Sequence, residues 1–241
     1  MSEFDKYALD YNQMHAENVK SSGYEPAFFD EYKVKEIYRV LSAENRADKP
    51  MSILNFGCGI GKSEPFLVQY FTKADVLGCD VSAESINIAR QNNQGLERAR
   101  FEHFEEGKSL PFNDVFDIIF IANVFHHIPR KFHKEILADL RSRLASDGSV
   151  FMFEHNPLNP LTVHTVNHCP FDADAVLLNP FYSVTLFRSA GFTEVKRKFT
   201  LFFPSLFGVL RRFEPLLSWL PLGAQYYIRA GKRQQPSRRL N

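Results

Sequence analysis

Short apolar runs alternate with segments of helical periodicity between residues 50 and 154. The runs typical of strands lie at 52–56, 75–80, 98–104, 115–122 and 149–154. Helical patterns separate them: one around Phe66 to Phe71, one over 82–93 with Ser82 as its N-cap, and one that starts at Pro129. This alternation predicts an α/β fold, a doubly wound parallel sheet with helices on both faces.

The helix that starts at Pro129 is expected to carry an apolar side chain every four residues. Its stripe is Phe132, Ile136, Leu140 and Leu144. The dipeptide Asp147-Gly148 is then expected to turn the chain into the strand at 149–154. Apolar stripes also predict helices over residues 4–20 and 26–41, a helix over 181–192, and strands over 193–200 and 225–232.

Three glycines, Gly57, Gly59 and Gly61, follow the first strand. Glycine is favoured where the backbone needs a positive φ, or where another molecule approaches too closely for a Cβ. Asp80 ends the second strand, and a carboxylate there can accept hydrogen bonds from both hydroxyls of a ribose. Because ligands bind at the carboxyl ends of parallel strands, the loop and the acid together predict a nucleoside site.

The loop reads G-x-G-x-G, with Lys62 where the third glycine of a dinucleotide fingerprint would fall. Four motifs follow one another from about Ile53 to Glu154: "LNFGCGIG", "VLGCDVS", "SLPFNDVFDIIFIANVFHHIP" and "LRSRLASDGSVFMFE". In this order they resemble the class I methyltransferases that depend on S-adenosylmethionine (SAM), of the type 11/12 kind. The resemblance implies a Rossmann-like sheet that is mostly parallel with an antiparallel last strand. It also implies methyltransferase activity, with SAM as cofactor and S-adenosylhomocysteine (SAH) as product.

The resemblance also implies which residues hold the cofactor. Those around the methionine part would be Gly57, Cys58, Gly59, Gly61, Ala122 and Asn123. Those around the adenosine would be Asp80 at the ribose, Val81 at the adenine and Glu106 near the adenine amino group. Asn55 departs from the family, which often has an acid there for the ammonium group of the ligand; an amide can accept a hydrogen bond but lacks the charge. Somewhat weaker cofactor binding is expected.

The methyl group of SAM is already activated, so a protein of this class has mainly to orient the acceptor. A general base is needed only where the acceptor atom carries a proton. His126 and His127 follow the fourth strand and are the candidate catalytic residues, although "HHIP" also resembles a structural turn of the family. Both interpretations stay open on the sequence alone.

Two insertions interrupt the second half of the chain, so the expected domains are an N-terminal helical cap at 1–45 and a SAM-binding domain at 46–241. The insertion at 155–179 is longer than usual strand connections, and long loops tend to be functional. Candidate acceptor contacts are Tyr11, His155, Asn156, His164, Asn167 and His168. No metal is expected, because His164, His168 and Cys169 lack a fourth ligand.

The second insertion, 201–223, is apolar but broken by Pro204, Pro215 and Pro221. Three interpretations stay open: helices that cover the acceptor pocket, a segment that binds a membrane interface, and a dimer contact. From Arg188 onward the sequence has eleven basic residues and two acidic ones, which favours an anionic partner. The expected acceptor is a small molecule, amphiphilic or lipid-linked, methylated on oxygen or nitrogen rather than carbon.

Composition is ordinary for a globular chain, with 44% hydrophobic and 24% charged residues. The start of the chain lacks the pattern of a signal peptide, and three cysteines form no paired framework, so a cytoplasmic protein is expected, with peripheral contact at the inner membrane surface as an option. It would be a monomer or a dimer. Two alternatives remain: a nucleotide-binding oxidoreductase that uses NAD, and a non-catalytic SAM-fold module at a membrane surface or in a complex. Nucleic acid is not the expected substrate, because "FIANVF" stands where base-methylating enzymes carry N/D-PP-Y/F.

Overall fold

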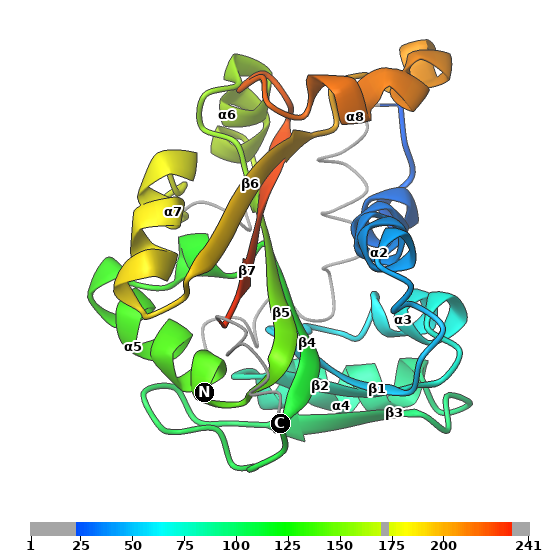
Figure 1. The fold of residues 1–241 in the computed structure, drawn as a ribbon, viewed down its shortest axis with the longest axis vertical. Helices are drawn as coiled ribbons and strands as arrows, with labels where there is room; N and C mark the ends of the chain where they lie inside the picture. Colours follow the sequence, from blue (N-terminus) through cyan, green and yellow to red (C-terminus); the bar gives the residue numbers. More distant parts are fainter. Residues whose placement is uncertain (1–22, 170–173, 233–241) are drawn as a thin grey trace, which may run out of the picture.

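A computed structural model describes residues 23–169 and 174–232 of the chain. Its centre is one seven-stranded sheet with the order β3-β2-β1-β4-β5-β7-β6 (Figure 1). The strands are β1 Met51–Phe56, β2 Ala74–Asp80, β3 Ala99–His103, β4 Phe116–Ala122, β5 Leu144–His155, β6 Glu194–Thr200 and β7 Gln225–Gly231. The helix predicted over 4–20, with Tyr11, falls outside the described residues.

The first five strands pair in parallel, and β7 is antiparallel to both β5 and β6. The predicted α/β fold with an antiparallel last strand is therefore confirmed. Strand order reverses between β1 and β4, which is where open sheets of this kind bind ligands. Because β6 runs in the same direction as β5, the segments that follow these two strands lie at the same, carboxyl edge of the sheet.

Helices cover the two faces of the sheet (Figure 1). On one face lie α2 (Pro26–Ala43) and α3 (Glu64–Tyr70), and on the other α5 (Arg130–Ser142) and α7 (Pro180–Ser189). The helix expected over 26–41 is thus present as α2, and its Val34, Ile37 and Leu41 are buried together with Ile53 of β1. The division of the chain at residue 45 remains a prediction.

Local signals in the sequence match the ends of two helices. The side chain of Ser82 accepts a hydrogen bond from the backbone of Ser85 at 3.0 Å, as an N-cap of α4 (Ala83–Asn92) should. Gly191, which follows α7, has a φ of 92°, in the left-handed region that glycine adopts at helix ends.

One sequence prediction was wrong at the end of α5. The helix stops at Ser142, and Leu144 is the first residue of β5, where it pairs with Phe116. Register then shifts before Ser149 pairs with Ile118, so Asp147 and Gly148 form an irregularity inside the strand rather than a turn before it. A Cβ on Gly148 would lie 2.8 Å from the Leu144 side chain. A leucine at position 144 can be buried at the end of a helix or at the start of a strand, as it is here, so periodicity alone could not distinguish the two.

The two insertions contain short helices and are joined to each other. The first holds α6 (Pro160–Asn167), and the second holds the 3-10 helix η5 (Ser205–Phe213) and α8 (Glu214–Leu217). The amide of Asn156 donates to the carbonyls of Pro221 at 3.1 Å and Gly223 at 2.7 Å, and that of Asn159 donates to Leu222 at 2.7 Å. Among the described residues, no helix is long and apolar enough to cross a membrane.

Candidate functional site

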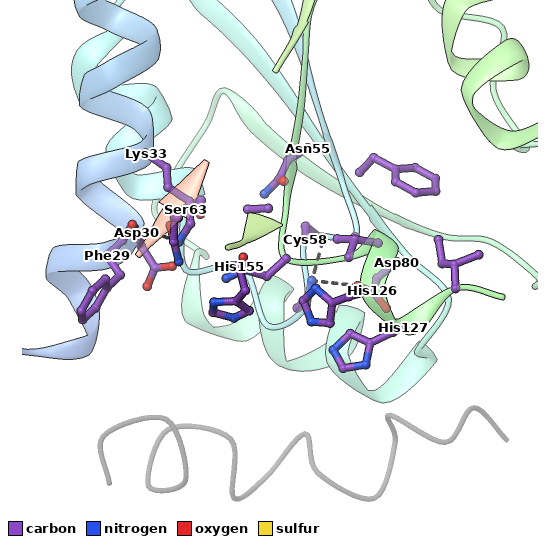
Figure 2. A pocket seen from close by; sticks show the side chains of 18 of the residues that line it. Phe29, Asp30, Lys33, Asn55, Cys58, Ser63, Asp80, His126, His127 and His155 are labelled. Carbon is purple, nitrogen blue, oxygen red and sulfur yellow. Dashed lines mark hydrogen bonds between the residues drawn. The ribbon is translucent and has the colours of Figure 1, made fainter. Parts of the chain in front are cut away.

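A cavity of about 1040 Å³ opens at the carboxyl edge of the sheet, where β1, β4 and β5 end (Figure 2). Pockets for one small ligand commonly measure about 300 to 1,000 Å³, so this cavity has room for two molecules. One half is lined by the glycine loop and the ends of β1 and β2. The other is lined by the residues after β4 and β5, α6 and residues 201–204, and α2 lies along both halves.

The glycine loop adopts the conformation that its sequence predicts. Gly57, Gly59 and Gly61 have φ values of 73°, 54° and 75°, which strain any residue with a Cβ. The backbone N–H groups of Gly57 and Cys58 donate to the carbonyl of Cys79 at 2.8 and 3.0 Å, which fastens the loop to β2. A Cβ on Gly57 would lie 2.4 Å from Val124, whereas nothing lies within 4 Å of one on Gly59. Gly59 therefore leaves bare backbone beside open space.

Asp80 lines the cavity and braces this loop. One carboxylate oxygen accepts the N–H of Gly59 at 2.8 Å and the other the N–H of Ser82 at 2.9 Å. Burial raises the pKa of Asp80, and the N–H groups of Ser82, Gly59 and Val81 oppose this rise. Each oxygen keeps acceptor capacity, so the geometry is compatible with the predicted ribose contact.

Other residues predicted for the cofactor also line this part of the cavity: Asn55, Cys58, Val81, Glu106, Ala122 and Asn123. Glu106 is exposed to solvent. Asn123 has a φ of 57°, and its side-chain oxygen is buried with no hydrogen-bond partner in the described part of the chain. A buried acceptor of this kind at a cavity wall is an expected feature of a ligand site.

Glu64 is a site residue that the sequence reasoning missed. It is fully buried, and its Oε1 accepts a hydrogen bond of 2.8 Å from the amide nitrogen of Asn55. Burial raises the pKa of Glu64 to about 7 although this hydrogen bond lowers it. Its Oε2 has no hydrogen-bond partner within the described residues. The family's acid is absent at position 55, but Glu64 supplies a carboxylate in contact with Asn55. In the sequence, Glu64 is visible only as the glutamate that follows "GIGKS".

His126 and Glu154 form a buried pair at the cavity, and Figure 2 shows His126 on the same side of it as Cys58 and Asp80. Nδ1 of His126, in the 3-10 turn η3 (Phe125–His127), lies 2.6 Å from Oε2 of Glu154 at the end of β5. The backbone N–H of Phe125 donates to the other carboxylate oxygen at 2.9 Å. Burial tends to raise the pKa of Glu154, but the charge and hydrogen bond of His126 outweigh it and the pKa is lowered.

This pair fixes the imidazole in one orientation. With Nδ1 directed at a carboxylate, Nε2 is the nitrogen that can take up a proton. The rings of His127 and His155 lie 4.2 and 5.4 Å from that of His126, centroid to centroid, and all three line the cavity. Both histidines proposed as catalytic from the sequence are therefore at the site, but Glu154 was not foreseen.

Charged side chains of α2 also reach the cavity (Figure 2). Lys33 is buried, and its Nζ donates to the carbonyl of Phe29 at 3.1 Å. Burial lowers the pKa of Lys33, and the charges of Asp30 and Glu154 act against this. The pKa of Asp30 is raised by burial, against the charges of Lys33 and Lys62. A helical stripe in a sequence cannot show this, because a buried lysine breaks the pattern that defines the buried face.

The residues predicted to contact an acceptor divide into two groups. His155 and His164 line the cavity, whereas Asn156, Asn167 and His168 do not. Asn156 is fully buried elsewhere, with its amide nitrogen bound to residues 221 and 223 and its side-chain oxygen accepting from Leu158 at 3.1 Å. Its role in the structure is to join the insertions. His168 and Asn167 lie exposed at the end of α6.

The wall of the second half is largely apolar. Its side chains include Phe29, Leu161, Val166, Leu201, Phe202 and Phe203. Among the residues that the structure describes, no group of three or more His, Cys, Asp or Glu side chains could hold a metal ion. The cavity thus combines a polar floor with an apolar wall.

Residues 53–148 match the model of a protein family described as "Methyltransferase domain". A tRNA N(3)-methylcytidine methyltransferase of Drosophila melanogaster is 28% identical over 123 residues, 47% of this chain and 37% of that protein. A trans-aconitate 2-methyltransferase of Rhodopseudomonas palustris is 30% identical over 112 residues, 46% of this chain and 41% of that protein. The chain therefore spans about two fifths of the length of these relatives.

Solved structures resemble the whole fold. A SAM-dependent methyltransferase of Thermotoga maritima superposes with a TM-score of 0.65 at 18% identity, covering 95% of this chain and 98% of that one. The magnesium protoporphyrin IX methyltransferase of Synechocystis, solved with bound SAH, gives 0.64 at 14% identity, covering 95% and 96%. At such identities the likeness shows the fold.

Proposed function

Because residues 53–148 form a methyltransferase domain of the class I, SAM-dependent kind, we propose that this chain methylates an oxygen or nitrogen atom of a small amphiphilic acceptor. The observation that supports this most is the two-part cavity. One part is a glycine loop with an acid, and the other is an apolar chamber with a buried His–Glu pair at its floor. Room for two molecules in one cavity is what transfer between them requires.

The residues present fit SAM. Bare backbone at Gly59 borders open space, Asp80 can accept from ribose hydroxyls, and the buried oxygen of Asn123 lacks a partner in the described residues. When bound, SAM supplies a methyl group on a positively charged sulfur, activated for displacement. Asn55 would face the ammonium group of the ligand as an acceptor, since its amide nitrogen is already held by Glu64.

His126 is suited to remove a proton from the acceptor. The proton would pass from the acceptor hydroxyl or ammonium to Nε2 of His126, while the lone pair so exposed takes the methyl group. Glu154 would stabilise the imidazolium that results, because its carboxylate lies 2.6 Å from Nδ1. Burial of the His126–Glu154 pair costs desolvation free energy, so the pair adds little to stability by itself. A role in proton transfer would explain why it is present.

The wall of the second half favours an acceptor with an apolar body and a polar end. Phe29, Phe202 and Phe203 offer aromatic surface, and Lys33 with Asp30 offers charge at the floor. A fully polar metabolite would leave the aromatic wall without a partner, and a plain hydrocarbon would leave the buried charges desolvated. An amphiphile satisfies both.

Calorimetry with SAH, followed by an SAH-release assay with a panel of amphiphilic phenols and amines, tests the proposal. SAH is expected to bind with micromolar affinity. His126→Ala should bind SAH equally well but turn over about 100-fold more slowly, the usual range for a lost general base. His168→Ala, which changes an exposed histidine outside the cavity, is the matched control.

The possible failures are distinguishable. Absence of any heat with SAH or SAM would overturn the methyltransferase proposal. Protection from thermal unfolding by NAD, but not by SAH, would revive the oxidoreductase alternative. If His126→Ala and wild type turned over equally, His126 would not be the general base, but the proposed methyltransferase activity would stand.

A further inference from the structure

Exposed apolar side chains gather on η5, α8 and the turn that follows them. Leu206 is 85% exposed, Val209 77%, Leu216 72% and Trp219 72%. Single exposed hydrophobic residues are ordinary, but a run of them on adjacent turns marks a surface that meets something apolar. We name this the 206–222 surface.

The 206–222 surface continues onto α6. Asn159 caps α6 through Leu161 and Thr162 and donates its amide to the carbonyl of Leu222 at 2.7 Å. Leu161, in the first turn of α6, is 78% exposed. Figure 1 shows α6 and α8 at the same end of the molecule. Both insertions therefore contribute to one apolar end, at the carboxyl edge of the sheet.

This surface is held rigidly from below. The guanidinium of Arg211 lies over the rings of Phe28 at 4.4 Å and Tyr32 at 4.7 Å on α2. The carboxylate of Glu214 accepts from the Tyr32 hydroxyl and from the backbone of Phe202, both at 3.0 Å. With its polar anchors turned inward, the segment presents its apolar side chains outward without further ordering, which favours binding.

The charge exposed by this segment is positive. Glu214, the sole acid of residues 201–223, is only 6% exposed, whereas Arg212 is exposed. Arg212 lies between Leu210 and Phe213, which are also exposed. Leucine, phenylalanine and tryptophan side chains next to arginine are the composition of segments that lie in the interface of an anionic bilayer.

From these observations we propose that the 206–222 surface, with Leu161, docks on a membrane that contains anionic lipid. A second copy of this chain fits the surface less well, because a two-fold contact over this surface would bring the exposed Arg212 of each copy toward that of the other. Docking would also place the membrane beside the cavity, since Leu201, Phe202 and Phe203 line that cavity directly before η5. An amphiphile could then pass from the lipid interface to the apolar wall.

Trp219 provides the test, because it is the single tryptophan of the chain and lies within the surface. Its fluorescence is measured on the full chain with vesicles of phosphatidylcholine alone and with vesicles that also contain phosphatidylglycerol. Emission should move to shorter wavelength with the anionic vesicles, less so at high salt, and hardly with phosphatidylcholine alone.

The double variant Leu206→Glu, Val209→Glu keeps Trp219 and changes only exposed side chains, so folding should persist. Vesicle affinity should fall by about tenfold or more, as expected when buried apolar area is replaced by repelled charge. Val115→Glu is the matched control, because Val115 is 59% exposed but precedes β4, at the opposite edge of the sheet. Its vesicle affinity should equal that of wild type.

Several outcomes would overturn the proposal. One is an emission spectrum unchanged by any vesicle; another is equal vesicle affinity in the double variant and wild type. A shift of emission with protein concentration in the absence of lipid, matched by a dimer mass in light scattering, would assign the surface to a second copy instead. SAH affinity measured on the same samples separates a failure here from a failure of the proposed activity.

Discussion

The two halves of the cavity are built by different means. The cofactor half is built mainly by one continuous stretch, residues 55–81, in which glycines set the backbone and Asp80 braces it, and Glu106, Ala122 and Asn123 complete it. The acceptor half consists of side chains from five separate segments, among them α2, η3, α6 and residues 201–204. The first is a local structure with a sequence signature. The second exists only after the whole chain has folded.

This difference predicts where substitutions should act. In the cofactor half a substitution changes the loop backbone and hence ligand affinity. In the acceptor half it changes buried charges and packing, and hence stability or turnover, while SAH affinity stays the same.

The largest effect is expected at Glu154, in the acceptor half. Glu154→Ala leaves His126 buried without its carboxylate and should lower the free energy of unfolding by about 4 kcal/mol. Urea denaturation measures this. Glu154→Gln keeps the size of the side chain and an acceptor, so its free energy of unfolding should fall clearly less. Each variant that remains folded should bind SAH as wild type does. A loss of SAH affinity in Glu154→Gln would break the division between the halves.

Gly57→Ala is the corresponding change in the cofactor half. The new Cβ would lie 2.4 Å from Val124 at a φ of 73°, so the loop must move. SAH affinity should fall about 100-fold, close to 3 kcal/mol, in isothermal titration calorimetry. Gly95→Ala, where a Cβ meets nothing within 4 Å, is the control. Unchanged affinity in Gly57→Ala would show that the ligand does not depend on this loop.

Glu64 sets a dependence of stability on pH. Its pKa is raised to about 7 in the folded chain, so folding favours the protonated form and its contribution is lost as pH rises from the unfolded value of 4.5 through about 7. Glu64→Gln should therefore gain about 3 kcal/mol of unfolding free energy relative to wild type at about pH 8, and little at about pH 4. Parallel melting curves across this range measure the difference. A constant difference would exclude the titration of Glu64 as its cause.

Asp80→Ala should weaken SAH binding by about tenfold or more, near 1.4 kcal/mol. The reason is the loss of both the ribose acceptor and the brace on Gly59. Asp80→Asn keeps an oxygen for one of these N–H groups and should lie between wild type and alanine. Calorimetry that finds all three equal would remove the ribose assignment.

The smallest effect on the cofactor is expected at Lys33. Lys33→Met removes a buried charge of α2 at the border of the two halves, and SAH affinity should change by less than about twofold, under 0.5 kcal/mol. The KM for an accepted amphiphile should rise if the lysine meets its polar end. A large change in SAH affinity would place Lys33 in the cofactor half.

The sequence predicted the first half well because its signals are local. A glycine that needs a positive φ, a serine that caps α4 and an acid that ends β2 each leave a mark within a few residues. The same reasoning missed Glu154, whose partner His126 lies on another segment, and Glu64, because a glutamate in the first turn of a helix is ordinarily exposed and nothing local shows that this one is buried. Asn156 was assigned to the acceptor and instead holds two insertions together, because nothing in "HNPLNP" reveals residues 221 and 223.

The hydrogen bonds from Asn156 and Asn159 to residues 221–223 join two stretches that are far apart in the chain into one structural unit. If α6 and the residues before it were transferred alone into a related protein, the side-chain amides of Asn156 and Asn159 would lose the carbonyls to which they donate. The earlier stretch must keep its two amides, and the later stretch must keep its backbone carbonyls where those amides can reach them. A change in the shape of this end of the molecule therefore requires matched changes in both stretches.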